Sequence, residues 1–444
     1  MSFRGVVALG MLVAAAGAER LANFAVRSFI AIDLSQREGM TAASIGVSFT
    51  ALSIGSVLAM FIGAGLVLAF GPRLTACLGA FLGAIGLSAM ALGAPILLGW
   101  SLYSIGAGVF RVCLFVAAAA MVGTEQSIPT EQSIPSAHMR APDPRRFLRL
   151  GAFAATAYAA SNVGAFLAAP IAGMLREYGG SSLGSAFAAA AALCAGALAF
   201  AGMTVGTERV AARAVPDTRD APYRAPAPLS APSPPAPVSM RPLAGAALLA
   251  CVLGALHVGE AAIGATPSLV ATKDVAWLYA MRAGITMIVG LIAAVVLLAA
   301  AVVGSPGTPG SRGPSHSPAS PRAPLPFFGA AMAVAGLGLV VGAFAGPGLA
   351  VLVAASGLTA FGVVAMSIGT AYVALAVPGR KSGLALAAWF AVASFAGIVG
   401  APLAYTALRT PLLVVVGLVC LASGIATAAF GRALHRTWFD PPPV

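Results

Sequence analysis

Apolar stretches long enough to cross a lipid bilayer take up most of this 444-residue chain. Hydrophobic residues make up 59% of the sequence and charged residues only 9%, and the mean hydropathy of +0.95 excludes an ordinary soluble domain. Twelve segments reach the roughly 20 residues that one crossing requires, and we therefore expect an all-α membrane protein with twelve transmembrane helices. The segments are approximately 3–34, 41–70, 74–98, 99–123, 148–175, 182–206, 243–265, 277–303, 326–346, 348–377, 384–407 and 411–431.

A linker rich in proline and charge divides these segments into two groups of six. Residues 207–242 include the stretch "RAPAPLSAPSPPAPVSMRP", which has too much proline to pack as part of a helix bundle. We expect an N-terminal six-helix half at 1–206, a cytoplasmic linker at 207–242 and a C-terminal six-helix half at 243–444. Two six-helix halves joined in this way describe the major facilitator architecture, in which a substrate site lies near the membrane midplane between the halves.

Lysine and arginine residues gather on one side of the expected membrane. Seventeen of the 25 fall on the side of the N-terminus, five fall on the opposite side or at its helix ends, and Arg20, Arg111 and Arg282 lie within the segments. This bias predicts a multi-pass protein of the inner (plasma) membrane with both termini in the cytoplasm. The first 18 residues also resemble a secretory signal, but the apolar pattern continues from Leu21 to Leu34, which favours a complete first helix.

The composition and motifs argue against several other classes of protein. The formal net charge is +12, but the arginines are scattered through connecting segments rather than gathered on one basic, aromatic face, so we expect no nucleic-acid binding. The five cysteines lack metal-ligand spacing, and the sequence has no P-loop and no GxSxG motif. We therefore expect neither an enzyme nor a bound metal or cofactor. The expected partners are the lipid bilayer and a small solute.

Three motifs in the N-terminal half carry a resemblance to a known family. The first segment contains "AGAERLANF", the fourth "GAGVFRVCL" and the fifth "AYAASNVGAFLAAPIAGMLREYG". These motifs resemble those of proton-dependent oligopeptide transporters, whose first helix carries an E-x-x-E-R motif. Glu19 and Arg20 match the end of that motif, whereas Ala16 replaces its leading glutamate. Arg111 stands where the family's fourth helix has a lysine.

Further motifs lie in the C-terminal half. The stretch "AYVALAVPGRKSGLALAAWFAVASFAGIVG" resembles the family's Pro-x-Arg loop and the Trp-Phe start of its next helix. The sequence departs at Val67, where facilitators commonly have an aspartate, and at Gly362, where peptide transporters have a glutamate. The resemblance implies proton-coupled uptake of small peptides or related anionic or zwitterionic solutes by alternating access of the two halves. Two alternatives stay open: a small-molecule exporter of the facilitator type, and a homologue that senses or binds a membrane partner without transporting.

Charged residues within the segments are the main candidates for function, because each costs roughly 2.5 to 3.5 kcal/mol to insert. The segments contain three arginines and two glutamates: Arg20, Arg111, Arg282, Glu19 and Glu260. The surplus of positive charge favours an anionic ligand. The resemblance assigns Arg20 and Arg111 to the substrate site, where guanidinium groups match a carboxylate. The alternative is that each arginine pairs with a glutamate and only joins two helices.

Three residues are candidates for proton coupling. Glu260 would lie in a cavity of low polarity, where desolvation disfavours the charged carboxylate and allows it to exchange protons. A permanent pair with Arg20 or Arg111 is its alternative role. His257 lies one turn before Glu260 on the same helical face and is a candidate proton relay, with a hydrogen bond between helices as the alternative. Glu19 adjoins Arg20, which favours its ionised form, so we expect it to hold Arg20 until the substrate arrives.

Aromatic and amide side chains complete the expected substrate site. Tyr158 and Asn162 of the fifth segment and Trp389 of the eleventh are expected to line it and to supply adaptable contacts. Tyr103 and Tyr372 are further candidates. The alternative is that each of these side chains only packs between helices.

Overall fold

The computed structural model of the chain describes residues 3–123, 144–214, 240–264, 272–303, 324–344, 349–377, 381–403 and 408–439. The regular elements in these residues are all helices, which confirms the expected all-α class. They are α1 (Phe3–Glu38), α2 (Ala42–Ala91), α3 (Ile96–Gly123), α4 (Pro144–Ala214), α5 (Met240–Gly264), α6 (Thr272–Val303), α7 (Leu325–Ala343), α8 (Leu349–Thr359), α9 (Gly362–Ala376), α10 (Ser382–Leu403) and α11 (Arg409–Phe439). Residues 215–239 of the expected linker lie outside the described residues.

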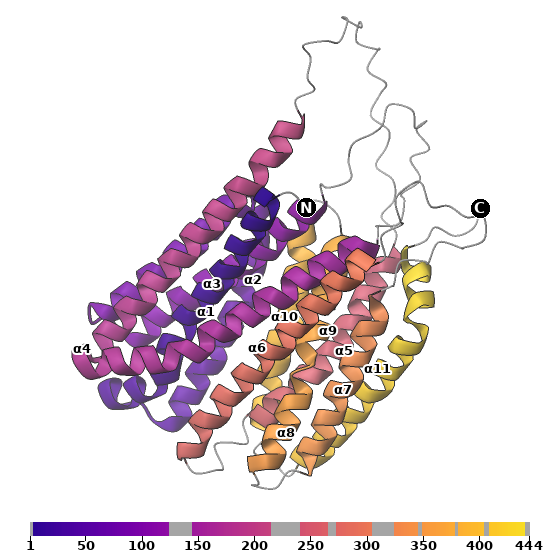
Figure 1. Ribbon diagram of the computed structural model, residues 1–444. Helices are drawn as coiled ribbons and strands as arrows, with labels where there is room; N and C mark the ends of the chain where they lie inside the picture. The colour runs from indigo at the N-terminus through magenta and orange to yellow at the C-terminus, as the bar shows by residue number, and fades with distance from the viewer. Residues whose placement is uncertain are drawn as a thin grey trace, which may run out of the picture.

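The two longest helices, α2 and α4, each contain a break at glycine. In α2 the break is at Gly71, whose φ of 79° lies in a region that glycine adopts readily. Pro72 follows it and has no N–H with which to continue the helical hydrogen bonding. In α4 the break is at Gly179 and Gly180, with a φ of 66° at Gly180, and Figure 1 shows the chain turning back in α4. Both breaks fall in gaps between the segments that the sequence predicts.

Other helix boundaries differ from the expected ones. The sequence predicts a boundary between residues 98 and 99, but the chain turns at residues 92–95, between α2 and α3. Gly93 has a φ of 91° there, and the carboxylate of Glu38 accepts the N–H of Ile96 at 2.7 Å, which fixes the start of α3. The expected tenth segment is divided into α8 and α9.

Nine helical stretches in the described part of the chain are long and apolar enough to cross a membrane. In that number α2 and α4 are each counted as one stretch, and part of α8 is counted together with α9. The apolar stretch of α10 is shorter and is not included. Large apolar side chains cover the outer face of α6, where Ile292, Val295 and Val302 are 58%, 68% and 65% exposed. Because such a face is unfavourable in water and suits lipid, the helices indicate a multi-pass membrane protein.

Helices α1–α4 form one half of the bundle and α5–α11 form the other (Figure 1). The main contacts between the halves join α4 to α6 and α9, and α2 to α10. Small residues allow a close approach, because a Cβ at Gly290 of α6 would lie 3.2 Å from the backbone oxygen of Ala155 and from the Cβ of Ala159 in α4. The start of α1 and the end of α11 lie at the same end of the bundle (Figure 1).

An aromatic cluster joins the two halves. The ring of Phe147 in α4 lies 4.6 Å from the ring of Tyr372 in α9. The Tyr372 hydroxyl lies 2.6 Å from Nδ1 of His435 in α11, within hydrogen-bonding distance. All three side chains are buried, so the cluster is a packed contact between α4 of one half and α9 and α11 of the other.

A buried ion pair ties the far end of α1 to α4. Asp33 is 6% exposed and accepts two hydrogen bonds from the guanidinium of Arg176, one of them 2.9 Å long from Nη1 to Oδ2. The same guanidinium lies 4.7 Å from the centre of the Phe29 ring. One turn further along α1, Arg37 donates a hydrogen bond of 2.8 Å to the Ser181 hydroxyl. These contacts hold this end of α1 against α4.

Candidate functional site

A cavity of about 410 Å³ lies between the two halves. Its volume falls in the range of sites that enclose small organic ligands. Side chains from seven helices line it: Ala16, Glu19, Arg20, Met60, Arg111, Leu114, Phe115, Ala157, Tyr158, Ser161, Asn162, His257, Glu260, Gly362, Val363, Met366, Phe390, Ala393 and Ser394. The cavity therefore gathers charged residues that lie far apart in the sequence.

One wall of the cavity carries two arginines around a single carboxylate. Oε1 of Glu19 accepts a hydrogen bond of 3.1 Å from Nη2 of Arg111, and Oε2 lies 3.7 Å from Nε of Arg20. Glu19 is buried, whereas the side chains of Arg20 and Arg111 are 28% and 24% exposed. Two guanidinium groups and one carboxylate leave this wall with a net charge of +1 when all three are ionised.

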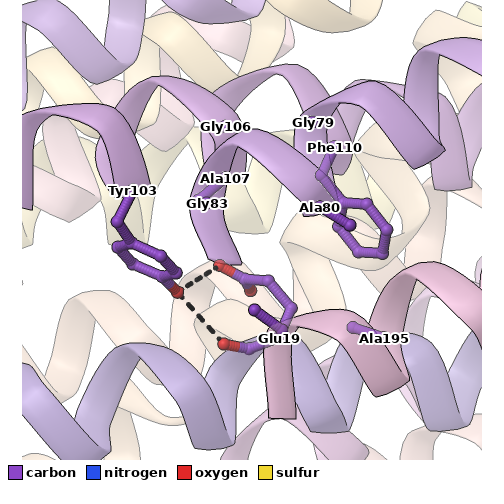
Figure 2. A pocket seen from close by; sticks show the side chains of 10 residues that line it. Glu19, Gly79, Ala80, Gly83, Tyr103, Gly106, Ala107, Phe110 and Ala195 are labelled. Carbon is purple, nitrogen blue, oxygen red and sulfur yellow. Dashed lines mark hydrogen bonds between the residues drawn. The ribbon is translucent and has the colours of Figure 1, made fainter. Parts of the chain in front are cut away.

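Tyr103 supports Glu19 from the side away from the large cavity. Its hydroxyl lies 3.2 Å from both Oε1 and the backbone oxygen of Glu19, and Figure 2 shows the hydroxyl directed at these two oxygens. Glu19 and Tyr103 also line a second pocket of about 10 Å³, roughly the space that one water molecule needs. Glu19 is thus held on two sides, by Tyr103 and by the arginines.

Close packing of α1 against α4 places Glu19 and Arg20 of α1 beside the cavity. A Cβ at Gly17 would lie 3.1 Å from the backbone oxygen of Ala160, and a Cβ at Gly164 would collide with the backbone oxygen of Gly17. The two backbones approach this closely because both glycines lack side chains. As a result, Arg20 of α1 and Tyr158 of α4 line the same space.

The other wall carries a histidine and a glutamate from α5. Nδ1 of His257 lies 2.9 Å from Oε2 of Glu260, one helical turn away. Oε1 of Glu260 lies 3.0 Å from the point where a side chain at Gly362 of α9 would begin. The carboxylate therefore occupies space that the absence of a side chain at Gly362 leaves open. Glu260 bonds to His257, not to Arg20 or Arg111, which were its expected alternative partners.

Aromatic rings from both halves meet at the cavity. Phe115 of α3 lies 5.1 Å from Phe390 of α10 and 6.1 Å from Tyr158 of α4, measured between ring centres. Near them, the side-chain amide of Asn162 donates a hydrogen bond of 2.8 Å to the backbone oxygen of Tyr158. These groups supply apolar surface and a few polar atoms beside the charged walls, as ligand sites commonly do.

Seven of the eight residues assigned to the site line this one cavity: Glu19, Arg20, Arg111, Tyr158, Asn162, His257 and Glu260. The further candidates Tyr103 and Tyr372 do not line this cavity. Trp389 does not line it. Its indole is 2% exposed and donates a hydrogen bond of 3.1 Å to the Thr370 hydroxyl of α9. The ring packs where a side chain at Gly369 would collide with it, so Trp389 faces α9 and its neighbour Phe390 faces the cavity.

Several cavity residues were not predicted from the sequence. Phe115, Ser161, Phe390 and Ser394 are residue types that also pack between helices, so their identity alone carries no signal. Gly362 stood out in the sequence only as a departure from a resembled motif. Among the described residues, no group of three or more His, Cys, Asp and Glu side chains is arranged to hold a metal ion.

No protein-family model matches the sequence, and no curated protein matches it. Among solved structures, the chain is similar to the crystal structure of a mutant of the peptide transporter POT in complex with alafosfalin. The TM-score is 0.56 at 17% identity, over 97% of this chain and 95% of that chain. The same mutant in complex with sulfate gives a TM-score of 0.54 at 18% identity with the same coverage. At this identity the likeness shows the fold, which this chain shares along nearly its whole length.

Proposed function

We propose that this protein is a secondary active transporter that couples the uptake of small peptides, or of related anionic or zwitterionic solutes, to protons. The observation that carries the proposal is the distribution of charge on the two walls of the cavity. Glu19, Arg20 and Arg111 sum to +1 on one wall, and Glu260 beside a neutral His257 gives −1 on the other. A solute with a carboxylate at one end and an ammonium group at the other complements both walls.

The proposed topology follows from the helices and their charges. Counting α2 and α4 as two crossings each adds two to the nine long apolar stretches, and α10 adds one, which gives twelve. The two halves then have six crossings each, and both ends of the chain lie on the same side. The excess of lysine and arginine in the loops on that side favours the cytoplasm, with the linker at 207–242 also cytoplasmic and the protein in the inner membrane.

The proposed substrate contacts divide between the walls. Arg20 and Arg111 bind the carboxylate, because guanidinium groups donate parallel hydrogen bonds to it. Glu260 accepts from the ammonium group. Tyr158 and Asn162 contact the middle of the solute, where the likeness to the two peptide-transporter structures supports a peptide-like compound. Trp389 contributes indirectly, through its packing against α9.

Proton coupling is assigned to the α5 wall. Glu19 already accepts from Arg111 and Tyr103 and lies next to Arg20, and these partners favour a permanently ionised carboxylate. Glu260 bonds only to His257 among the described residues. The α5 pair can therefore change its proton content without breaking a bond to arginine, and alternating access of the two halves would expose it to each side in turn.

Uptake into liposomes tests the proposal. The purified protein is reconstituted, and accumulation of a labelled dipeptide such as dialanine is followed with the outside more acidic than the inside. We expect accumulation above the outer concentration, its collapse when a protonophore is added, and weak competition by a dipeptide whose C-terminal carboxylate is blocked as an amide. Uptake that is independent of the proton gradient, or extrusion in the opposite direction, would contradict proton-coupled import.

A further inference from the structure

His257 has one ring nitrogen bound and the other unused. Its Nδ1 lies 2.9 Å from Oε2 of Glu260. An ionised carboxylate only accepts hydrogen bonds, so Nδ1 carries the hydrogen and Nε2 of the neutral ring holds a lone pair. Nε2 is buried and has no hydrogen-bond partner among the described residues. A buried polar atom without a partner needs a reason, because it has lost its contact with water.

Among the described residues, the ring of His257 has one hydrogen-bond partner, the carboxylate of Glu260. On its own helix His257 has Glu260, and from α6 Arg282 acts on Glu260 electrostatically. The titratable or charged groups across the cavity are Glu19, Arg20, Arg111 and Tyr158, and α11 places Cys420 behind α5. The cavity residues from α9 and α10 are Gly362, Val363, Met366, Phe390, Ala393 and Ser394, none of which titrates.

We propose that Nε2 of His257 is the atom that takes up the transported proton, while Glu260 stays ionised as the partner of the imidazolium. The inference rests on the proposed function, and it places the transported proton on the imidazole of His257 rather than on the carboxylate of Glu260. A carboxylate bonded to Nδ1 fixes the ring tautomer and stabilises the positive ring that forms when Nε2 is protonated. Gly362 is the positioning residue, because its missing side chain leaves room for the carboxylate.

The proton balance of the step is simple. A hydronium ion on the open side loses a proton to Nε2, so that one of its O–H bonds breaks, an N–H bond forms and water is left. Glu260 offsets the charge of the imidazolium. When the cavity opens to the other side, that N–H bond breaks and the proton returns to water. Protonation also turns Nε2 from an acceptor into a donor and brings the α5 wall from −1 to 0.

Histidine NMR of the whole purified protein in detergent tests the assignment. The sequence has four histidines, at 138, 257, 316 and 435, and the signal that disappears in His257→Gln identifies the ring. We expect a neutral ring with hydrogen on Nδ1 in alkaline buffer, and an imidazolium with hydrogen on both nitrogens in acidic buffer. In Glu260→Gln, whose amide keeps a hydrogen bond without the charge, less imidazolium should form at the same acidic pH. A His257 ring that stays neutral throughout, or a Glu260 carboxyl that takes the proton in an infrared titration, would overturn the proposal.

Transport by matched variants separates this inference from the proposed function. His257→Gln and His257→Asn should lose accumulation driven by the proton gradient and keep exchange of labelled for unlabelled dipeptide. His435→Gln changes a buried histidine outside the cavity and should keep accumulation. Proton-driven accumulation in a folded His257 variant would overturn the inference and leave the proposed function standing. If the wild-type protein does not accumulate dipeptide but the His257 ring becomes an imidazolium in acidic buffer, the proposed function is overturned. Nε2 is then still supported as the proton-binding atom.

Discussion

Replacement of Arg111 by alanine should remove high-affinity binding of a dipeptide. Nη2 of Arg111 binds Glu19 at 3.1 Å, while its Nε is buried with no hydrogen-bond partner among the described residues, so the guanidinium has donors left for a ligand. Without it, Glu19 and Arg20 cancel, and the charge of this wall falls from +1 to 0. Losing one hydrogen-bonded charge contact costs on the order of 2 to 5 kcal/mol, which is roughly a thirtyfold loss of affinity or more.

Two companion variants separate a direct contact from a structural pair. Arg111→Lys keeps the charge but has a compact ammonium in place of the guanidinium fork, and it should retain part of the affinity. Glu19→Gln combined with Arg111→Ala restores the charge of the wall to +1, which Arg20 then carries alone. It also avoids a Glu19 carboxylate that has lost its hydrogen bond from Arg111. If Arg111 contacts the substrate, binding stays weak in the double variant.

The assay is equilibrium binding of a labelled dipeptide to the purified protein, after thermal unfolding has shown that each variant folds. Binding is measured for the wild-type protein, both single variants and the double variant at the same pH and salt. Recovery of wild-type affinity in the double variant would refute the reasoning, because Arg111 would then serve only to neutralise Glu19. Wild-type affinity in folded Arg111→Ala would refute it more simply.

Three further predictions concern other parts of the chain. Asp33→Asn leaves the partly buried Arg176 without its carboxylate and should lower the free energy of unfolding by about 3 kcal/mol, measured by denaturation, with dipeptide affinity unchanged in the folded protein. Gly362→Ala places a Cβ 2.8 Å from Cδ2 of Leu256 and 3.0 Å from Oε1 of Glu260, so both side chains must shift and uptake should fall. Gly357→Ala meets only a side-chain atom at 4.0 Å and should leave uptake unchanged. A reporter fused to the C-terminus should be active in the cytoplasm, and activity only on the outer side would contradict the proposed topology.

Most of the helices and the charged residues of the cavity could be predicted because the membrane restricts where polar groups lie. A charged side chain in a lipid-facing position is costly, so Glu19, Arg20, Arg111 and Glu260 had to face the interior of the bundle. Breaks at Gly71 and Gly180 were equally visible, since glycine and proline interrupt an apolar run there. Composition thus predicted the class of fold, and the costly charges predicted Glu19, Arg20, Arg111 and Glu260, whereas Tyr158 and Asn162 were predicted from their residue types and from a resembled motif.

The remaining features depend on contacts between distant segments. The run from Ala94 to Leu98 is apolar throughout, so hydropathy alone does not show that the turn precedes Ile96. Trp389 turns away from the cavity because Gly369, twenty residues earlier in sequence, opens a space for its ring. The pair of Glu260 and His257 is local to α5, but the space at Gly362 that the Glu260 carboxylate occupies depends on how α5 packs on α9. No local pattern shows where Trp389 or Glu260 packs, because each side chain fills space left by a glycine on another helix.

The most direct measurement compares accumulation and exchange in liposomes that contain either the wild-type protein or Glu260→Gln. The variant is matched in size and keeps a hydrogen-bonding group beside His257, but it cannot supply the negative charge that offsets a bound proton. We expect the wild-type protein to concentrate a labelled dipeptide when the outside is acidic. The variant should lose this accumulation but still exchange labelled for unlabelled dipeptide when the dipeptide concentration is raised to offset the lost contact between Glu260 and the ammonium group. Proton-driven accumulation that survives in Glu260→Gln would contradict the assignment of coupling to the α5 wall.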